Sequence, residues 1–212
     1  MNGKPLTPEH GFPLRVVIPG IAGARSVKWL DQITIAGQES QNFYMQRDYK
    51  VLPSDAIDAE SAEKYWSITP ALMSMPCNSV VASPSSGETV ELGMSSNNKV
   101  LAIDGYALPH GDDGPVVKVE ISVDNGKTWQ EAELQHPDGA GKWAWSLWTF
   151  QLTLTDLARV GKQGEDGKKG VVISILSKAT DRGGNTQDDC EWNLRGVAYN
   201  GYGEARDVRV VI

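Results

Sequence analysis

Short runs of apolar and β-branched residues, separated by turn residues, fill the chain after residue 76. Spacing of this kind is typical of an all-β sandwich. The clearest hairpin is the stretch 117–129, where Asn125-Gly126 favours a type I′ turn because both central positions need a positive φ. The expected strands occupy residues 78–83, 89–93, 99–107, 115–123, 127–134, 143–154, 171–180, 189–195 and 206–212.

The first third of the chain follows a different pattern. Short strands are predicted over 12–18 and 27–35, and Pro19-Gly20 and Gly23 separate them. The acidic stretch that follows Lys50 has no strong period, which indicates an extended linker with one helical turn. The predicted organisation has three parts, residues 1–50, 51–75 and 76–212.

Composition and charge narrow the class of protein and of partner. The 212 residues are 40% hydrophobic and 22% charged, which is ordinary for a globular protein, and no apolar run reaches the roughly 20 residues of a membrane span. Residues 1–50 carry six Lys/Arg against four Asp/Glu, whereas the remaining residues carry fourteen against twenty-three. The acidic bulk argues against nucleic acid as a partner, and the local positive excess fits a small anionic ligand.

Tryptophan and cysteine each leave two interpretations open. Trp143 and Trp145 share one face of a predicted strand, so they pack either in the core or in a subunit interface, where aromatic side chains are enriched. Cys77 and Cys190 lie far apart and have no metal-site spacing, which predicts reduced, partly buried thiols and no metal site, with a disulfide as the alternative. The segment 161–170 lacks the spacing of a phosphate-binding loop and is interpreted as a solvated loop.

The candidate chemistry lies near the N-terminus, where His10, Arg15, Arg25 and Lys28 stand within twenty residues. Arg15 begins a predicted strand, and Ser26 and Lys28 alternate along the next one, so a hydroxyl, an ammonium and a guanidinium can converge on a phosphate. Surface salt bridges are the alternative explanation.

A second candidate is Arg195, which stands between a leucine and a glycine near the end of the chain. If Arg195 faces inward, it needs an anionic partner, because an unpaired buried cation is costly. The chain has no Gly-x-Ser-x-Gly sequence, and its remaining histidines and paired carboxylates lie in turns, so nothing supports a hydrolase.

Five motifs in order carry a family resemblance: NGKPLTPEHGFPLRVVIPGIAGARSVKWL, QRDYKVLP, SVDNGKTW, KWAWSLW and WNLRGV. They make the whole chain resemble the C-terminal half of eukaryotic-type sulfite oxidases. The resemblance implies a mainly β fold: the end of an α+β molybdopterin-binding domain over 1–50, then an immunoglobulin-like dimerisation domain over 76–212. It also implies a homodimer, with sulfite and sulfate as ligands.

The resemblance assigns roles to six residues. His10 and Arg15 would contact the molybdopterin, Ser26, Val27 and Lys28 would bind its phosphate end, and Arg195 would line the sulfite/sulfate pocket. Nitrate reductases share this architecture but typically carry Met at the Arg195 position, so Arg195 favours sulfite.

The resemblance also implies an incomplete site. In the family, the cysteine that binds molybdenum precedes the matched segment, and the His-Pro-Gly-Gly signature of the haem domain is missing here. The chain is therefore expected to be inactive alone, as part of a molybdenum oxidoreductase. The alternatives are a non-catalytic immunoglobulin-like dimerisation module and a fragment of an assimilatory nitrate reductase. The intermembrane space of mitochondria, the cytosol and the peroxisome all remain open as compartments.

Overall fold

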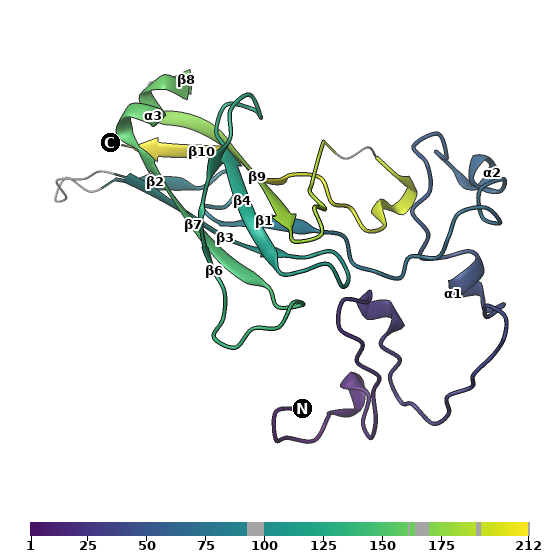
Figure 1. Cartoon of the computed structure of the whole chain (residues 1–212). Helices are drawn as coiled ribbons and strands as arrows, with labels where there is room; N and C mark the ends of the chain where they lie inside the picture. Colours follow the sequence, from purple (N-terminus) through teal and green to yellow (C-terminus); the bar gives the residue numbers. More distant parts are fainter. Residues whose placement is uncertain (93–99, 161, 164–169, 190–191, 212) are drawn as a thin grey trace. The chain divides into compact units, whose positions relative to one another are not determined.

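The computed structural model describes residues 1–92, 100–160, 162–163, 170–189 and 192–211 (Figure 1). The chain forms two compact units. The first comprises Met1–Pro76 with Glu191–Tyr199, and the second comprises Cys77–Cys190 with Asn200–Ile212. The nine residues Glu191–Tyr199 thus belong with the N-terminal unit although the sandwich precedes and follows them. None of the described helices is both long and apolar enough to cross a membrane.

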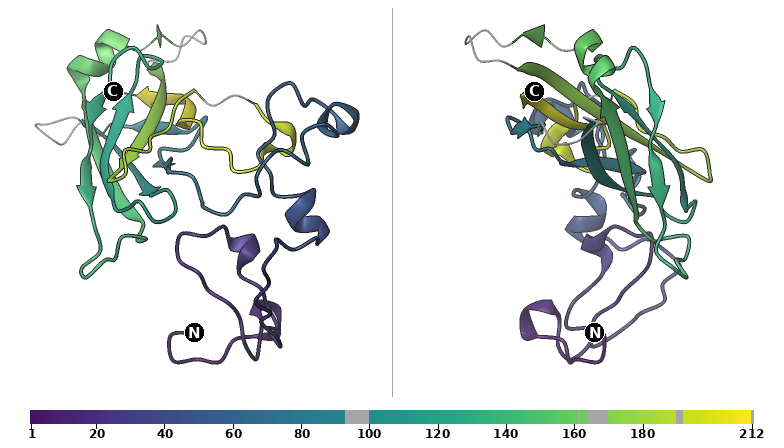
Figure 2. Two further views of the ribbon diagram at one scale, coloured as in Figure 1. Left: turned by 45° about the vertical axis from the view of Figure 1, so that its right-hand side comes forward. Right: turned by 90° about the vertical axis from the view of Figure 1, so that its left-hand side faces the viewer.

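The second unit is a sandwich of two sheets, seen from three sides in Figures 1 and 2. One sheet has the order β1-β3-β7-β6, with β1 Asn78–Ser83, β3 Val100–Leu108, β7 Ser146–Thr153 and β6 Glu133–Gln135. The other has the order β2-β10-β9-β4-β5, with β2 Thr89–Glu91, β10 Gly203–Val211, β9 Val171–Asp181, β4 Val116–Ser122 and β5 Gln130–Glu131; β8 Lys162–Gln163 pairs with β9. This architecture confirms the predicted mainly β, immunoglobulin-like fold.

Alternation of side chains explains why these segments become strands. Along β9, every second residue from Ile173 to Asp181 is buried, as expected for a strand with one face on the core. Trp148 of β7 fills the interior opposite Gly105 of β3, where an added Cβ would lie 2.1 Å from the indole ring. The Asn125-Gly126 turn has φ values of 60° and 78°, which confirms the predicted hairpin.

One prediction about the end of the chain is wrong, and one of the two interpretations of the tryptophans is excluded. The described residues of the expected strand 189–195 form no strand, because Arg195 adopts the left-handed region at φ 72° inside the 3-10 turn η3 Leu194–Gly196. Trp143 and Trp145 precede β7 and are 41% and 57% exposed, which excludes core packing. The helix α3 Leu154–Val160, which follows β7, is an element that the pattern did not predict.

The first unit has little regular structure. It holds the 3-10 turns η1 Pro8–His10 and η2 Gly23–Arg25 and the single-turn helices α1 Phe43–Gln46 and α2 Ala59–Ala62. The predicted strands 12–18 and 27–35 are wrong, since only one bridge, Arg15 to Lys28, forms there. Pro13 and Pro19 have no N–H to donate, and Trp29 adopts a positive φ of 53°, so a longer ladder is interrupted.

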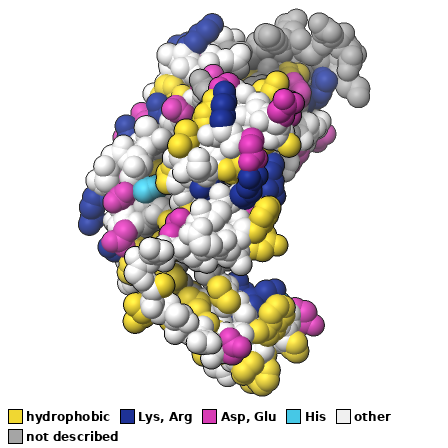
Figure 3. Space-filling model, turned by 90° about the vertical axis from the view of Figure 1, so that its right-hand side faces the viewer, with side chains coloured by type: hydrophobic (Ala, Val, Ile, Leu, Met, Phe, Trp, Pro, Cys, Tyr) yellow, Lys and Arg dark blue, Asp and Glu magenta, His cyan; other side chains and the backbone are white. Residues whose placement is uncertain are grey.

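The segment 51–75 carries the predicted helical turn, α2, which is closed by a reciprocal Asp58–Ser61 capping box. It also packs as more than a linker, because a small core of Leu52, Ala56 and Ala62 lies there against Trp66 and Leu194. Many other apolar side chains of this unit remain exposed, and Figure 3 shows them gathered on its surface.

Candidate functional site

Two of the predicted cations lie side by side in the first unit. Arg15 and Lys28 face each other in the isolated antiparallel bridge. Backbone hydrogen bonds flank the bridge, from Val16 N–H to the Val27 carbonyl at 3.0 Å and from Leu30 N–H to the Leu14 carbonyl at 3.0 Å. This two-stranded ribbon therefore fixes both positive charges at the same level.

A glycine allows His10 to join them. Gly11 ends η1 with φ 108°, and an added Cβ would lie 3.1 Å from the Lys28 Cβ and 3.2 Å from the Arg15 Cβ. The Arg15 guanidinium reaches to 3.5 Å from the His10 carbonyl. Residues His10, Arg15 and Lys28 thus form one cluster, which we call the basic ribbon.

The positive charge of the basic ribbon is not neutralised by close ion pairs. Lys28 Nζ donates to the Glu9 carbonyl at 2.9 Å, and His10 Nδ1 lies 2.7 Å from Thr7 Oγ1. In the part of the chain that the structure describes, no carboxylate lies within 4 Å of Arg15 or Lys28. This observation counts against the salt-bridge explanation and leaves both cations available for an anion such as a phosphate.

Ser26 and Val27 connect the basic ribbon to a cavity. Ser26 follows η2, and its N–H donates to the Gly23 carbonyl. Val27 is 54% exposed and lines a cavity of about 430 Å³ together with Arg25, Tyr44 and Tyr49. Arg25 holds this region together, since its guanidinium donates to the Leu72 carbonyl at 3.1 and 3.2 Å.

Arg195 has the anionic partner that its sequence context required. Its Nη1 lies 2.5 Å from Asp48 Oδ1; the Asp48 side chain is 10% exposed and the Arg195 side chain 56%. Asn193 closes the turn around it, because the Asn193 side-chain oxygen accepts from Val197 N–H at 2.9 Å. The guanidinium is therefore fixed at one end by Asp48, while much of the side chain remains open to solvent.

Two functional residues that the sequence reasoning missed, Tyr49 and Lys50, directly follow Asp48. Tyr49 adopts a positive φ of 47°, and its N–H donates to Asp48 Oδ1 at 3.0 Å. The Tyr49 ring lies 5.7 Å from the Arg25 guanidinium. Lys50 is 5% exposed, and its ammonium donates to the Trp66 carbonyl at 2.5 Å. The available signal was the run Asp48-Tyr49-Lys50, with charged residues on either side of a tyrosine just before an apolar segment.

Sequence neighbours of Lys28 and of Asp48 line the cavity, whereas Lys28 and Arg195 themselves do not. Val27, which precedes Lys28, and Tyr49, which follows Asp48, both line it. Among the described residues, no hydrogen bond or ion pair joins the ribbon cations to Arg195. The predicted residues therefore fall into two separate groups, the basic ribbon and the Arg195–Asp48 pair.

The described residues offer no metal centre of their own. No group of three or more His, Cys, Asp and Glu side chains that could hold a metal occurs among them. Burial, together with the negative charge of Asp181, raises the pKa of the Cys77 thiol to about 12, so Cys77 stays protonated at neutral pH. Cys77 is a free thiol, as predicted; Cys190, like most of the loop 161–170, lies outside the described residues.

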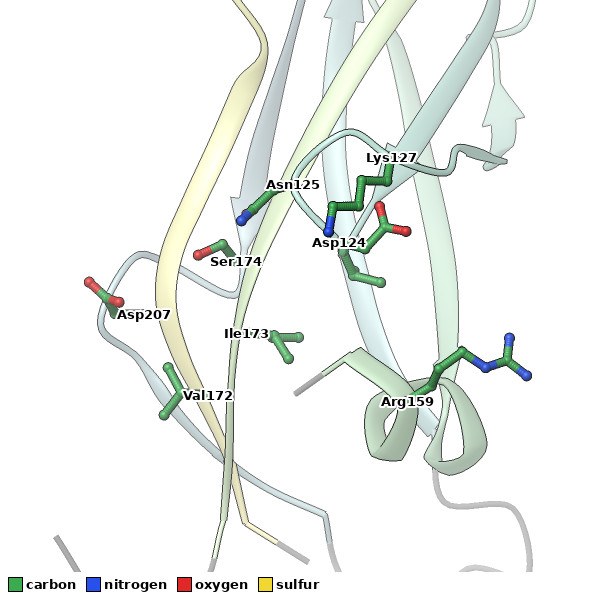
Figure 4. A pocket seen from close by; sticks show the side chains of 9 residues that line it. Asp124, Asn125, Lys127, Arg159, Val172, Ile173, Ser174 and Asp207 are labelled. Atoms are coloured by element: carbon green, nitrogen blue, oxygen red, sulfur yellow. The ribbon is translucent and has the colours of Figure 1, made fainter. Parts of the chain in front are cut away.

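A second cavity, of about 430 Å³, lies in the sandwich beside the 124–127 turn (Figure 4). It is lined by charges of both signs, including Asp124 and Arg159, and by none of the predicted site residues. Burial opposes ionisation of Asp124, but hydrogen bonds from Thr128 and Ser122 outweigh it and lower the pKa of Asp124 to about 2. The carboxylate thus stabilises its own turn, which explains its position without a ligand.

Two protein-family models match successive parts of this chain. The family model of the Mo-co oxidoreductase dimerisation domain matches residues 69–206, and that of the oxidoreductase molybdopterin binding domain matches residues 1–44. Mitochondrial sulfite oxidase of Rattus norvegicus is 38% identical over 95% of this chain and 34% of its own length. Nitrate reductase [NAD(P)H] of Hordeum vulgare is 36% identical over 94% of this chain and 22% of its own length.

The fold has a counterpart among solved structures. The sulfane dehydrogenase SoxCD of Paracoccus pantotrophus superposes with a TM-score of 0.68 and 21% identity, over 97% of this chain and 49% of that one. The chain spans about a third of the length of the sulfite oxidases that it matches. Because the dimerisation-domain model covers most of the chain and the molybdopterin-domain model covers the basic ribbon, the protein belongs to the molybdenum-cofactor oxidoreductases.

Proposed function

We propose that this chain is part of an oxidoreductase that converts sulfite to sulfate, in which it supplies cofactor contacts, a substrate-binding arginine and a dimer interface. The observation that carries the proposal is Arg195, held at 2.5 Å by the buried carboxylate of Asp48 and still 56% exposed. A guanidinium fixed at one end presents its remaining N–H groups in a defined direction, which suits an oxyanion.

The basic ribbon would hold the phosphate end of a molybdopterin cofactor. Arg15 and Lys28 supply charge, His10 and Ser26 supply hydrogen bonds, and Val27 provides an apolar wall. Within the described ranges no carboxylate lies within 4 Å of Arg15 or Lys28, although the Glu9 carboxylate is close enough to Lys28 and His10 to interact electrostatically, and this donor set fits a phosphate. Held by these residues, the cofactor would supply the two-electron oxidation of sulfite and the added oxygen atom.

Arg195 would bind and orient the sulfite anion. Asp48 prevents the arginine side chain from moving freely, so less conformational entropy is lost when the anion binds. The positive charge of the guanidinium would offset charge on the substrate oxygens, and its free N–H groups would donate hydrogen bonds to them. These steps concern binding and orientation by the residues of this chain.

A nitrate substrate is the closest alternative, since nitrate reductases are among the relatives. Arg195 favours sulfite, because a dianion gains more from a fixed cation than a monoanion does. A different class of function is a dimerisation module with no ligand of its own.

Binding of sulfate, the reaction product, to the 212-residue chain distinguishes an oxidoreductase part that binds an anion from a non-catalytic dimerisation module. Titration with sulfate, followed by NMR of the backbone amides of residues 193–197, is expected to shift those signals in the wild type. Arg195→Gln is expected to abolish the shift, and Arg182→Gln, an exposed arginine of the other unit, to leave it unchanged. No shift in the wild type would favour the non-catalytic module.

We further propose that the chain alone does not oxidise sulfite. Large apolar side chains of the first unit, such as Trp29, Ile33 and Ile35, are 58%, 76% and 97% exposed, so this unit does not enclose a dry site. Purified chain is expected to contain no molybdenum by mass spectrometry and to reduce no ferricyanide with sulfite. Stoichiometric molybdenum with sulfite turnover would contradict this part of the proposal.

A further inference from the structure

Arg25 belongs to the basic N-terminal segment, but the proposed function gives it no role. All three nitrogens of its guanidinium donate to neutral acceptors of the protein. Nε and Nη2 donate to the Leu72 carbonyl at 3.2 and 3.1 Å, and Nη1 donates to the Tyr44 carbonyl at 3.4 Å and to Met45 Sδ at 2.6 Å. Because these donors are already engaged, the contacts of Arg25 indicate a role in the protein framework and not in binding an anion.

The backbone of Arg25 leads directly into the residues that would bind the phosphate end of the cofactor. Arg25 is the last residue of η2, and residues 26–28 follow it. Its carbonyl accepts from Val27 N–H at 3.1 Å, and the Val27 carbonyl accepts from Val16 N–H at 3.0 Å across the two-stranded ribbon. Because the side chain of Arg25 is fixed, the entry of the chain into this ribbon is fixed with it.

Leu72 connects Arg25 to Tyr49. The Leu72 carbonyl accepts from two nitrogens of Arg25, and the Leu72 N–H donates to the Tyr49 carbonyl at 2.7 Å. The Arg25 guanidinium also lies 5.7 Å from the centre of the Tyr49 ring, which is within the range of a cation–π contact. Arg25 therefore holds Tyr49 in two ways, through the backbone at Leu72 and through the aromatic ring.

Tyr49 in turn orients Asp48. Tyr49 adopts a φ of 47°, a conformation that persists in a residue other than glycine only where the surroundings enforce it. Its N–H donates to Asp48 Oδ1 at 3.0 Å, and the same oxygen lies 2.5 Å from Arg195 Nη1. The direction of the Arg195 guanidinium therefore depends on a peptide group that Arg25 and Leu72 hold in place.

We propose that Arg25 is a positioning residue that holds the phosphate-end contacts of residues 26–28 and the exposed guanidinium of Arg195 in one fixed geometry. It acts on Arg195 through Tyr49 and Asp48 and does not touch the anion. The inference rests on the proposed function only for the anion that Arg195 binds. A side chain that is already oriented loses less entropy when an anion binds, so the loss of Arg25 weakens that binding from a distance.

The positive charge of Arg25 offers a different explanation, in which the charge attracts an anion whatever the geometry. Arg25→Lys separates the two explanations. Lysine keeps the charge but lacks the planar fork that donates from two nitrogens to one carbonyl. Positioning therefore predicts weaker anion binding in Arg25→Lys, whereas attraction by charge predicts binding as in the wild type.

Hydrogen exchange of the full chain tests the connection without any ligand. The amides of residues 196–197 donate to Asn193 and report opening of the turn around Arg195. Arg25→Lys is expected to accelerate their exchange about 5-fold, the effect of losing one uncharged hydrogen bond. Because Arg25 acts through Asp48, adding Arg25→Lys to Asp48→Asn is expected to accelerate exchange no further. Unchanged exchange in Arg25→Lys, or effects that multiply in the double variant, would overturn the proposal.

The matched control is Arg182→Lys, the same substitution at an exposed arginine of the other unit, which is expected to leave this exchange unchanged. Far-UV circular dichroism checks the fold of each variant. If Arg25→Lys does not fold, Tyr49→Leu decides. It removes the ring beside the Arg25 guanidinium but keeps the backbone hydrogen bonds of residue 49. It is also expected to accelerate exchange, and exchange as in the wild type would overturn the proposal.

Sulfate binding separates this inference from the proposed function. Arg25→Lys is expected to raise the dissociation constant for sulfate about 5-fold, measured from the amide signals of residues 193–197, and Arg182→Lys to leave it unchanged. A wild type with no sulfate shift overturns the proposed function alone, since hydrogen exchange still decides whether Arg25 positions Arg195. Sulfate binding in Arg25→Lys that is as tight as in the wild type overturns the positioning role.

Discussion

The ion pair between Asp48 and Arg195 gives an asymmetric prediction. Arg195→Gln leaves the carboxylate of Asp48, which is 10% exposed, with the Tyr49 N–H as its described donor. Asp48→Asn instead leaves an arginine that is 56% exposed and can be hydrated, and the amide oxygen can still accept from Tyr49. Removing the exposed Arg195 should therefore reduce the stability of this turn more than neutralising the buried Asp48.

The magnitudes follow from these exposures. A buried charged acceptor that loses a hydrogen bond costs about 2 kcal/mol. A half-exposed pair is screened by water, so neutralising Asp48 should cost about 1 kcal/mol. Gln keeps the Cβ of Arg195, so the unfavourable φ of 72° contributes equally to both proteins and cancels.

Hydrogen exchange measured by mass spectrometry gives the local readout. The Gly196 and Val197 amides donate to the Asn193 backbone and side-chain oxygens, so they report opening of the turn that holds Arg195. Their exchange should accelerate about 30-fold in Arg195→Gln and about 5-fold in Asp48→Asn. Equal protection in both variants and the wild type would refute the idea that the ion pair fixes this turn.

Three further predictions concern the sandwich. Gly105→Ala should destabilise the chain by about 3 kcal/mol in urea unfolding, because the new Cβ would lie 2.1 Å from the Trp148 ring and from the Val80 carbonyl; unchanged stability would contradict the packing. The pKa of Asp124 is lowered to about 2, so its ionised form stabilises the fold above pH 3.8. That contribution, about 2 kcal/mol, is lost as the pH falls towards 2. The difference in unfolding free energy between the wild type and Asp124→Asn should therefore disappear in acid. Cys77 should resist iodoacetamide at pH 8 until urea unfolds the sandwich, since its pKa is raised to about 12; rapid modification in the native state would count against its burial.

The sandwich strands were largely predictable because their signals are local. The alternation along β9 and the Asn125-Gly126 turn both follow from neighbouring residues alone. The same alternation placed Trp143 and Trp145 on one face but could not decide which face meets the core, because a period of two is symmetric between the two sides. Their exposure of 41% and 57% follows only from tertiary packing.

The site was less predictable because it depends on distant contacts. Arg195 and Asp48 are 147 residues apart in sequence, so composition could require an anionic partner for Arg195 without identifying it. In the N-terminal segment, the apolar run Val16-Val17-Ile18 predicted a strand, but those residues lack a long pairing partner and Val17 is 67% exposed. The sequence motif could bring Arg15 and Lys28 together. It did not show that Gly11 must pack closely against both residues, where a larger side chain would have little room.

The sulfite-oxidising role can be measured in a chimera in which this chain replaces the matching third of Rattus norvegicus sulfite oxidase. We expect the chimera to oxidise sulfite and not to reduce nitrate. Arg195→Met should raise the KM for sulfite about 100-fold with a smaller effect on kcat. This is the size of effect expected when a charge-assisted contact to the substrate, worth roughly 2–3 kcal/mol, is lost. Nitrate reduction by the chimera, or sulfite kinetics that Arg195→Met leaves unchanged, would contradict the proposed role of this chain.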